Sequence, residues 1–254
     1  MIVENLLADL AAQHAELDAL LAPLDDASWA LASPCVGWDI SDVVLHLHQT
    51  DELAIASLRG DLTHAVESFI RGGAADEDSV DAAAALSVEQ SRGESGAQVL
   101  TRWRRSAGEL RAEFTLVDPS ARLQWVVGQL SARTLAATRL SECWIHTGDV
   151  ATALGVELVA TDRLRHIARL AWRTVPYAFD RAGHRLTGPV GFDLVGPGGD
   201  RWGFGLDDGP GTVVAGDAHE LCLLAGRRRS PEKTGLVATG PDAALVMELV
   251  RTYA

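Results

Sequence analysis

The chain has 254 residues, of which 47% are hydrophobic, and it carries a formal net charge of −13 with a pI of about 5.0. This apolar content is enough for a packed core and excludes an intrinsically disordered chain. The acidic balance argues against nucleic acid and anionic membrane surfaces as partners, because both bind basic patches.

The sequence carries no signal for secretion or for a membrane span. Acidic residues interrupt the amino-terminal stretch from position 4, and no basic region precedes an uninterrupted apolar run. No apolar run reaches the length that crosses a bilayer. Cys35, Cys143 and Cys222 are odd in number and far apart, so a disulfide framework is not expected. We therefore expect a cytoplasmic protein.

The amino-terminal part predicts two helices joined by a turn and a loop. Residues 3–23 place leucines at helical spacing. Residues 33–38, Ser-Pro-Cys-Val-Gly-Trp, predict an irregular loop. Asp39 or Ser41 can cap the second helix, because a short oxygen side chain satisfies free backbone amides, and Gly60 ends it.

Two more long helices follow a mixed, acidic segment. Residues 61–94 predict short helices and loops, with a double glycine at 72–73 as a breaker. Residues 95–116 predict a third long helix, and Ser131 starts a fourth that stops at Gly155. Four main helices with short connections indicate an antiparallel bundle.

The pattern changes after the bundle. Residues 161–182 are again helical, and short β-like runs separated by glycine-rich turns follow. We expect strands at 190–195, 201–206 and 212–215, a helix at 217–226, a strand at 235–239 and a helix at 241–253. The chain is therefore expected to be α+β, with a four-helix bundle at 1–156 and a small α/β domain at 157–254.

Four polar residues of the fourth helix share one face. Arg139, Glu142, His146 and Asp149 are spaced by three, four and three positions, which is the repeat of a helix face. Such a stripe is ordinary on a solvated helix, where i,i+4 pairs are common and weakly stabilising. From this helix alone, a solvated face is the simpler interpretation.

The second helix adds a histidine among apolar neighbours. We expect His46 to face the core, where an imidazole needs a partner. If the bundle brings it to Glu142 and His146, two imidazoles and one carboxylate form a typical catalytic zinc set with open positions. A hydrogen-bonded core histidine explains His46 equally well. His48 is a rival ligand, which should lie at the helix flank if His46 faces the core. His14 could approach the site, although a hydrogen-bonded, packed histidine is the simpler interpretation.

The segments that carry these residues are similar to one protein family. Within residues 33–47, Ser-Pro-Cys-Val-Gly-Trp, Asp-Val-Val and His-Leu resemble the first motif of the mycothiol-dependent maleylpyruvate isomerases. Residues 139–155 contain Arg-Leu-Ser-Glu-Cys-Trp-Ile-His-Thr-Gly-Asp-Val-Ala and Ala-Leu-Gly, which resemble the second. These actinobacterial proteins belong to the DinB/YfiT-like metalloprotein group. The resemblance implies an α+β fold, with a DinB-like four-helix bundle before a small α/β domain.

The resemblance selects among the candidate residues. It implies a divalent metal, zinc, held by His46, Glu142 and His146, and thus prefers His46 to its rival in the same helix. It also implies that Arg139 and Asp149 lie behind the ligands or in the substrate pocket, and we predict both as catalytic residues.

A third segment resembles the family near the carboxyl end. Residues 223–227, Leu-Leu-Ala-Gly-Arg, imply an arginine that binds the anionic substrate or thiol. Arg227, Arg228 and Arg229 stand together here. We predict Arg227 and Arg228 as binding residues and Arg227 also as catalytic, and a solvated basic turn is the alternative. The family position of Cys35 favours a packed structural thiol over a nucleophile. Cys143 points a quarter turn away from the polar face and is excluded as a ligand.

The function implied by the resemblance is that of a metal- and mycothiol-dependent isomerase or S-transferase. A metal-bound thiolate would attack a small unsaturated or otherwise electrophilic acid, with mycothiol as cosubstrate. The alternatives are a thiol-independent metalloenzyme that uses metal-bound water, and a non-catalytic binding protein of the same fold. The expected partners are a small electrophilic substrate and a low-molecular-weight thiol, without nucleic acid or membrane.

Overall fold

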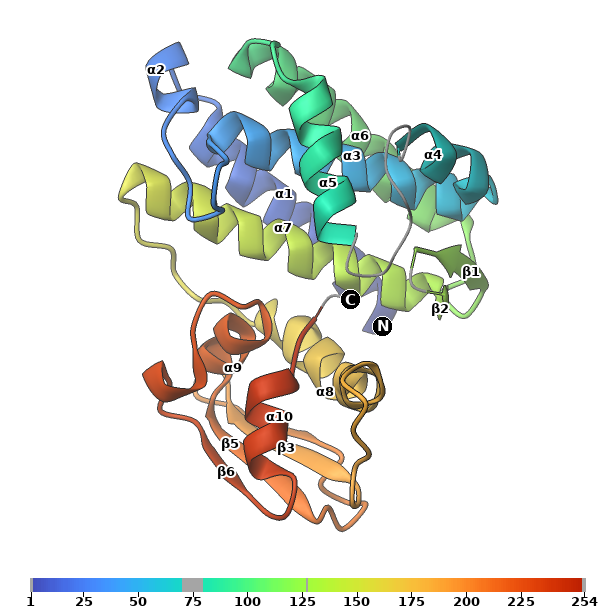
Figure 1. The fold of residues 1–254 in the computed structure, drawn as a ribbon, viewed down its shortest axis with the longest axis vertical. Helices are drawn as coiled ribbons and strands as arrows, with labels where there is room; N and C mark the ends of the chain where they lie inside the picture. The colour runs from blue at the N-terminus through green and yellow to red at the C-terminus, as the bar shows by residue number, and fades with distance from the viewer. Residues whose placement is uncertain (1, 70–79, 127, 253–254) are drawn as a thin grey trace. The chain divides into compact units, whose positions relative to one another are not determined.

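The structure is a computed structural model that describes residues 2–69, 80–126 and 128–252. It divides into two compact units, Met1–Leu158 and Val159–Ala254. In the described residues, the first unit combines helices with one hairpin, and the second combines helices with a four-stranded sheet (Figure 1). The expected α+β class, a helical bundle before a small α/β domain, is confirmed.

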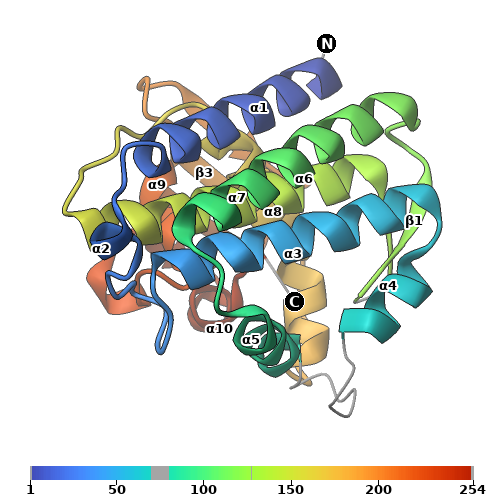
Figure 2. The same ribbon diagram turned by 90° about the horizontal axis from the view of Figure 1, so that it is seen from above.

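Four long helices build the first unit. The helices α1 and α3 each pack against both α6 and α7, as the view from above shows (Figure 2). The short helices α4 and α5 pack against α3. In chain order the elements are α1 (Ile2–Leu21), α2 (Asp26–Trp29), α3 (Ile40–Arg59), α4 (Leu62–Phe69), α5 (Val80–Ser91), α6 (Gly96–Leu116), β1 (Arg122–Trp125), β2 (Gly128–Ser131) and α7 (Ala132–Leu154).

The helix ends follow from local side-chain chemistry. Asp39 caps α3 and Ser131 caps α7, each by accepting a hydrogen bond from a backbone nitrogen three residues later. Gly60 and Gly155 end the same helices in the left-handed conformation, with φ values of 79° and 68°. These predicted boundaries are confirmed, and Asp39 rather than Ser41 is the cap.

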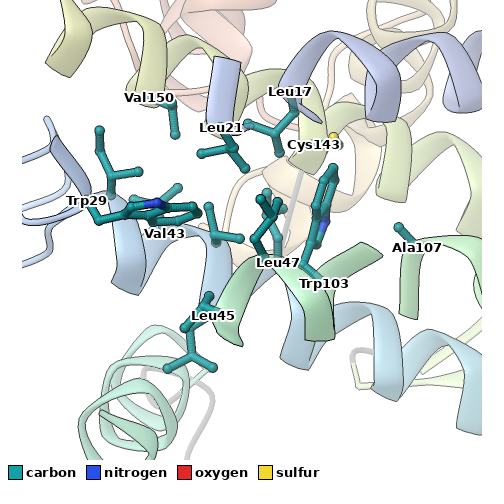
Figure 3. Close-up of a cluster of buried hydrophobic side chains, with 14 of the residues drawn as sticks. Leu17, Leu21, Trp29, Val43, Leu45, Leu47, Trp103, Ala107, Cys143 and Val150 are labelled. Carbon is teal, nitrogen blue, oxygen red and sulfur yellow. The ribbon is translucent and has the colours of Figure 1, made fainter. Parts of the chain in front are cut away.

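A continuous apolar core holds the bundle together. Its buried side chains come from α1, α3, α6 and α7, with Trp29 from α2 and Val88 from α5 (Figure 3). Trp103 of α6 is one of two tryptophans in this core and is 1% exposed. Because α3 packs against α2, α4, α5, α6 and α7, it is buried almost all round. The polar residues of α3 therefore need partners inside the bundle.

Two elements of the first unit were not predicted. The strands β1 and β2 pair antiparallel, with Leu123 opposite Leu130. The turn expected at residues 23–28 overlaps the single-turn helix α2, which Asp25 caps. The segment 61–94 forms α4 and α5 as expected, and the double glycine at 72–73 lies outside the described residues.

The second unit is a mixed sheet with helices. The strand order is β4-β3-β5-β6, with β3 antiparallel to β4 but parallel to β5. Phe192 of β3 is fully buried and stands opposite Phe204 of β4 and Val214 of β5. The expected elements are confirmed, although the last helix is shorter than predicted. They are α8 (Leu164–Arg181), β3 (Val190–Val195), β4 (Arg201–Phe204), β5 (Thr212–Asp217), α9 (Ala218–Ala225), the 3-10 helix Pro231–Lys233, β6 (Val237–Thr239) and α10 (Ala243–Leu249).

The length and hydropathy of the helices test whether any of them could span a membrane. Within the described residues, none of the helices is both long enough and apolar enough to span a bilayer.

Candidate metal centre

The capped start of α3 fixes the position of His46. The Asp39 carboxylate accepts a hydrogen bond from the backbone nitrogen of Asp42 at 2.9 Å, and the Asp42 carboxylate accepts one from the backbone nitrogen of Asp39 at 3.3 Å. This reciprocal cap starts the helix at Ile40. His46 therefore lies in the second turn, where 9% of it is exposed and its ring approaches α7.

The polar stripe of α7 faces the interior of the bundle. Arg139 and Asp149 are each 2% exposed and His146 is 7% exposed. The Glu142 side chain is 19% exposed. A solvated face, the simpler interpretation from the sequence, is therefore wrong, because α1 and α3 pack against this helix on two sides.

Three donor atoms from the two helices converge on one point. Nε2 of His46 and Nε2 of His146 each lie 3.7 Å from Oε2 of Glu142. One donor atom of each residue lies within 4.8 Å of the other two. A separation of 3.7 Å is too long for a hydrogen bond. It is close to the spacing of about 3.3 Å that two ligand atoms have around a tetrahedral zinc ion.

The ring of His146 is held from its other side. Asp149 Oδ2 lies 2.9 Å from Nδ1, which leaves Nε2 directed at Glu142. A carboxylate behind a histidine is the usual support for a metal-binding imidazole, because it fixes the tautomer and the ring orientation. Burial lowers the pKa of His146, but hydrogen bonds to Asp149 and Cys35 and the charge of Glu142 outweigh it and raise this pKa to about 9.

The electrostatics of the cluster favour a cation. Burial alone would raise the pKa of Glu142, but the two imidazoles and Arg139 hold it at about 2, so the carboxylate is ionised. Burial lowers the pKa of His46, which keeps that ring neutral. The negative charges of Glu142 and Asp149 therefore need a positive charge beside them. Either a proton on His146 or a metal ion can provide it.

A second observation concerns His46 itself. Its Nδ1 is buried and has no hydrogen-bond partner among the described residues. Its ring packs against Trp38, with centroids 5.2 Å apart. The donor set of two imidazoles and one carboxylate fits a divalent metal with open positions. That the three residues bind a metal stays a prediction, but the fold brings all of them together.

Comparison with known proteins places the chain in a family. A family profile described as the mycothiol maleylpyruvate isomerase N-terminal domain matches residues 10–151, which include all three candidate ligands. The chain belongs to this family. Two uncharacterized proteins from two strains of Mycobacterium tuberculosis are each 36% identical to it over 250 residues, covering 97% of this chain and 94% of theirs.

Solved structures agree with the family in fold. The crystal structure of the mycothiol-dependent maleylpyruvate isomerase matches with a TM-score of 0.61 and 16% identity, covering 93% of this chain and 92% of that one. A histidine-to-alanine mutant of that enzyme matches with a TM-score of 0.60 and 17% identity over the same shares. At this identity the likeness shows the fold alone.

Arg139, which the family motif includes, forms a buried ion pair with α3. Its Nε donates to Asp51 Oδ1 at 3.0 Å, and its Nη2 donates to Thr50 Oγ1 at 2.8 Å. Asp51 is 2% exposed, like Arg139. The guanidinium thus links the two helices that supply the candidate ligands. These contacts give Arg139 a structural role, and its predicted catalytic role stays a prediction.

The two other candidate histidines, His48 and His14, and Cys143 lie away from the candidate centre. His48 is buried, with Nδ1 2.9 Å from Ser106 Oγ, and not at a helix flank, because α6 covers that side of α3. His14 is buried and its Nδ1 contacts the Arg111 guanidinium. Cys143 is 1% exposed, and burial raises its pKa to about 12. None of them is among the described donor groups that converge at the candidate centre.

Cys35 lies closer to the candidate centre than the sequence suggested. Its Sγ is 3.3 Å from Asp149 Oδ2 and 4.0 Å from His146 Nδ1. The thiol therefore contacts a residue that supports a candidate ligand and is not only a packed structural group. The signal in the sequence was the loop motif itself, but nothing local indicates that position 35 meets position 149.

Arg227 and Arg228 belong to the second unit. Arg227 has a positive φ of 59° and donates through Nη1 to the backbone oxygen of Glu248 at 2.8 Å. Arg228 donates through Nη1 to the backbone oxygen of Gly226 at 3.0 Å. Both lie within three residues of the end of α9. Their part in binding substrate or thiol stays a prediction.

Proposed function

We propose that the chain is a metal- and mycothiol-dependent enzyme, an isomerase or S-transferase similar to maleylpyruvate isomerase, acting on a small unsaturated or otherwise electrophilic acid. One observation carries the proposal. His46, Glu142 and His146 converge from two helices in a buried cluster, and Asp149 supports one of the rings. Membership of the mycothiol maleylpyruvate isomerase family supports the choice of thiol.

The three residues would hold a divalent metal, Zn²⁺, and leave open positions. When bound, such a metal lowers the pKa of a coordinated thiol and provides a thiolate nucleophile at neutral pH. The chain's own residues prepare the site. Burial keeps His46 neutral, the low pKa of Glu142 keeps its carboxylate ionised, and Asp149 holds Nδ1 of His146 so that Nε2 faces the centre.

The proposed chemistry concerns the double bond of the substrate. The thiol adds to one carbon, the new single bond rotates, and elimination of the same thiol gives the geometric isomer. Without elimination of the thiol, the product is an S-conjugate. Arg227 and Arg228 are proposed to bind the substrate carboxylate or the thiol, because a guanidinium fork pairs with a carboxylate through two hydrogen bonds.

The first test is metal content. The untagged protein is purified as wild type, His146→Ala and His64→Ala, and metal is measured by inductively coupled plasma mass spectrometry. His64 is the matched control, because its side chain is 82% exposed on α4 and contacts only Asp61 in the described ion pairs. We expect about one equivalent of metal in wild type and His64→Ala, and a large loss in His146→Ala.

The second test is activity. The metal-loaded protein is assayed with a panel of unsaturated acids, with and without a low-molecular-weight thiol. Turnover that requires both metal and thiol supports the proposal. Turnover without thiol would replace it by a thiol-independent metalloenzyme. Absence of metal from the wild type, even after incubation with zinc, would refute it.

A further inference from the structure

The loop before α3 is a tight turn that places two side chains beside the candidate centre. The backbone nitrogen of Trp38 donates to the backbone oxygen of Cys35 at 3.0 Å, and Gly37 between them has a φ of +81°. This is the pattern of a type II turn, whose third position needs a positive φ. Val36, at the second position, is fully exposed.

The turn is tied down at both ends. The hydroxyl of Ser33 donates to the backbone oxygen of Trp38 at 2.9 Å and accepts from the backbone nitrogen of Cys35 at 3.1 Å. Arg92, which directly follows α5, donates through Nη2 to the backbone oxygen of Gly37 at 2.9 Å. These hydrogen bonds fix the backbone of the loop and therefore the position of Cys35.

Cys35 meets the carboxylate that supports His146. Its Sγ lies 3.3 Å from Oδ2 of Asp149, and that same oxygen lies 2.9 Å from Nδ1 of His146. The thiol and the imidazole can both donate to this oxygen, and Asp149 is 2% exposed. Since Sγ lies on the Nδ1 side of the ring, it is on the opposite edge from Nε2, which faces Glu142.

We propose that Cys35 is a positioning residue for the metal centre. Its thiol donates to Asp149, and this second hydrogen bond holds the carboxylate in the orientation that fixes the His146 ring. The inference rests on the proposed function, because it assumes that His146 is a metal ligand. Removal of the thiol leaves the Asp149 carboxylate with one donor fewer, and the imidazole loses part of its alignment with the other two ligands.

The experiment measures zinc dissociation constants by competition with a chromophoric chelator. The variants are Cys35→Ala, Cys35→Ser, Asp149→Asn and the double variant Cys35→Ala/Asp149→Asn. Cys143→Ala is the control for loss of a thiol, because Cys143 is a buried residue of α7 whose thiol contacts Thr147. The melting temperature of each metal-free variant reports whether it is folded.

We expect Asp149→Asn to weaken zinc binding about 10- to 100-fold. Cys35→Ala should weaken it about 3- to 10-fold, as expected for the loss of one hydrogen bond. Cys35→Ser keeps a donor and should bind nearly as well as wild type. The double variant should bind no more weakly than Asp149→Asn, because Cys35 acts through that carboxylate. Cys143→Ala should bind like wild type.

Other results would overturn the inference. Equal zinc affinity in Cys35→Ala and wild type would do so, and would leave the proposed function intact. The thiol would only pack if Cys35→Ser bound zinc as weakly as Cys35→Ala. The same would follow if Cys35→Ala weakened zinc binding as much in the Asp149→Asn background as in the wild type. Two zinc equivalents in wild type and one in Cys35→Ala would make Cys35 a ligand of a second ion. Absence of zinc from the wild type would overturn both the inference and the proposed function.

Discussion

The ion pair of Arg139 and Asp51 links the two helices that carry the candidate ligands. Arg139 lies one turn before Glu142 on α7, and Asp51 lies in the second turn after His46 on α3. Nε of Arg139 lies 3.0 Å from Asp51 Oδ1 and Nη2 lies 2.9 Å from the same oxygen. Both side chains are 2% exposed, so water can replace neither partner.

We predict that Arg139→Met destabilises the metal-free protein by about 3–5 kcal/mol at pH 7, the usual cost of removing one member of a buried pair. The methionine fills much of the space, so the cost comes mainly from the Asp51 carboxyl, which loses its cation and must either take up a proton or stay buried as an uncompensated charge. The measurement is the free energy of unfolding in urea. Arg139→Met/Asp51→Leu should recover most of the loss, because it leaves no charge buried.

A surface pair provides the control. Arg59 bonds to Glu109 and Glu113, and its side chain is 48% exposed. Arg59→Met should therefore lower the free energy of unfolding far less than Arg139→Met. If Arg139→Met costs less than about 1 kcal/mol and instead reduces turnover of the metal-loaded enzyme, the structural role is refuted and the catalytic role predicted from the sequence is restored.

Three further results are expected. Burial raises the pKa of Asp51 from 3.8 to about 6 against the opposing charge of Arg139, so the native state binds this proton more readily than the unfolded state and stability should fall as pH rises from 4 to 6. Asp51→Asn should remove that slope in urea unfolding. Gly37→Ala should cost about 1–2 kcal/mol by forcing alanine into positive φ, whereas Val36→Ala should be neutral in the same assay. Glu142→Gln should weaken zinc binding more than about 100-fold in chelator competition, because a neutral amide replaces the ionised ligand.

Most of the helices could be predicted because their signals are local. Capping by Asp39 and Ser131 and termination at Gly60 and Gly155 each depend on residues within one turn. The strands β1 and β2 were missed because each is four residues long and its burial does not alternate clearly. The pairing of Leu123 with Leu130 depends on the partner strand, which a periodicity within one segment does not reveal.

Part of the candidate site could likewise be predicted from the sequence, and part could not. Glu142 and His146 share a helix face at i,i+4, so the sequence alone could place them side by side. Their direction could not be predicted, because the stripe with Arg139 and Asp149 looks solvated until α1 and α3 are packed against it. The position of His46 opposite this face was indicated by its apolar neighbours and selected by the family resemblance.

The contact between Cys35 and Asp149 could not be predicted from the sequence. The residues are 114 positions apart, and the distance of 3.3 Å between them depends on two independent structures, a turn and a helix packing. The turn is local, since Gly37 supplies the positive φ that directs Val36 outward. The packing of α7 against α3 is not local, because it is set by core side chains that come mainly from α1, α3, α6 and α7. The Cys35 thiol, which the sequence predicts as a packed structural group, lies beside the candidate ligands only when the turn and the helix packing are both formed. Its role can therefore be tested through Asp149.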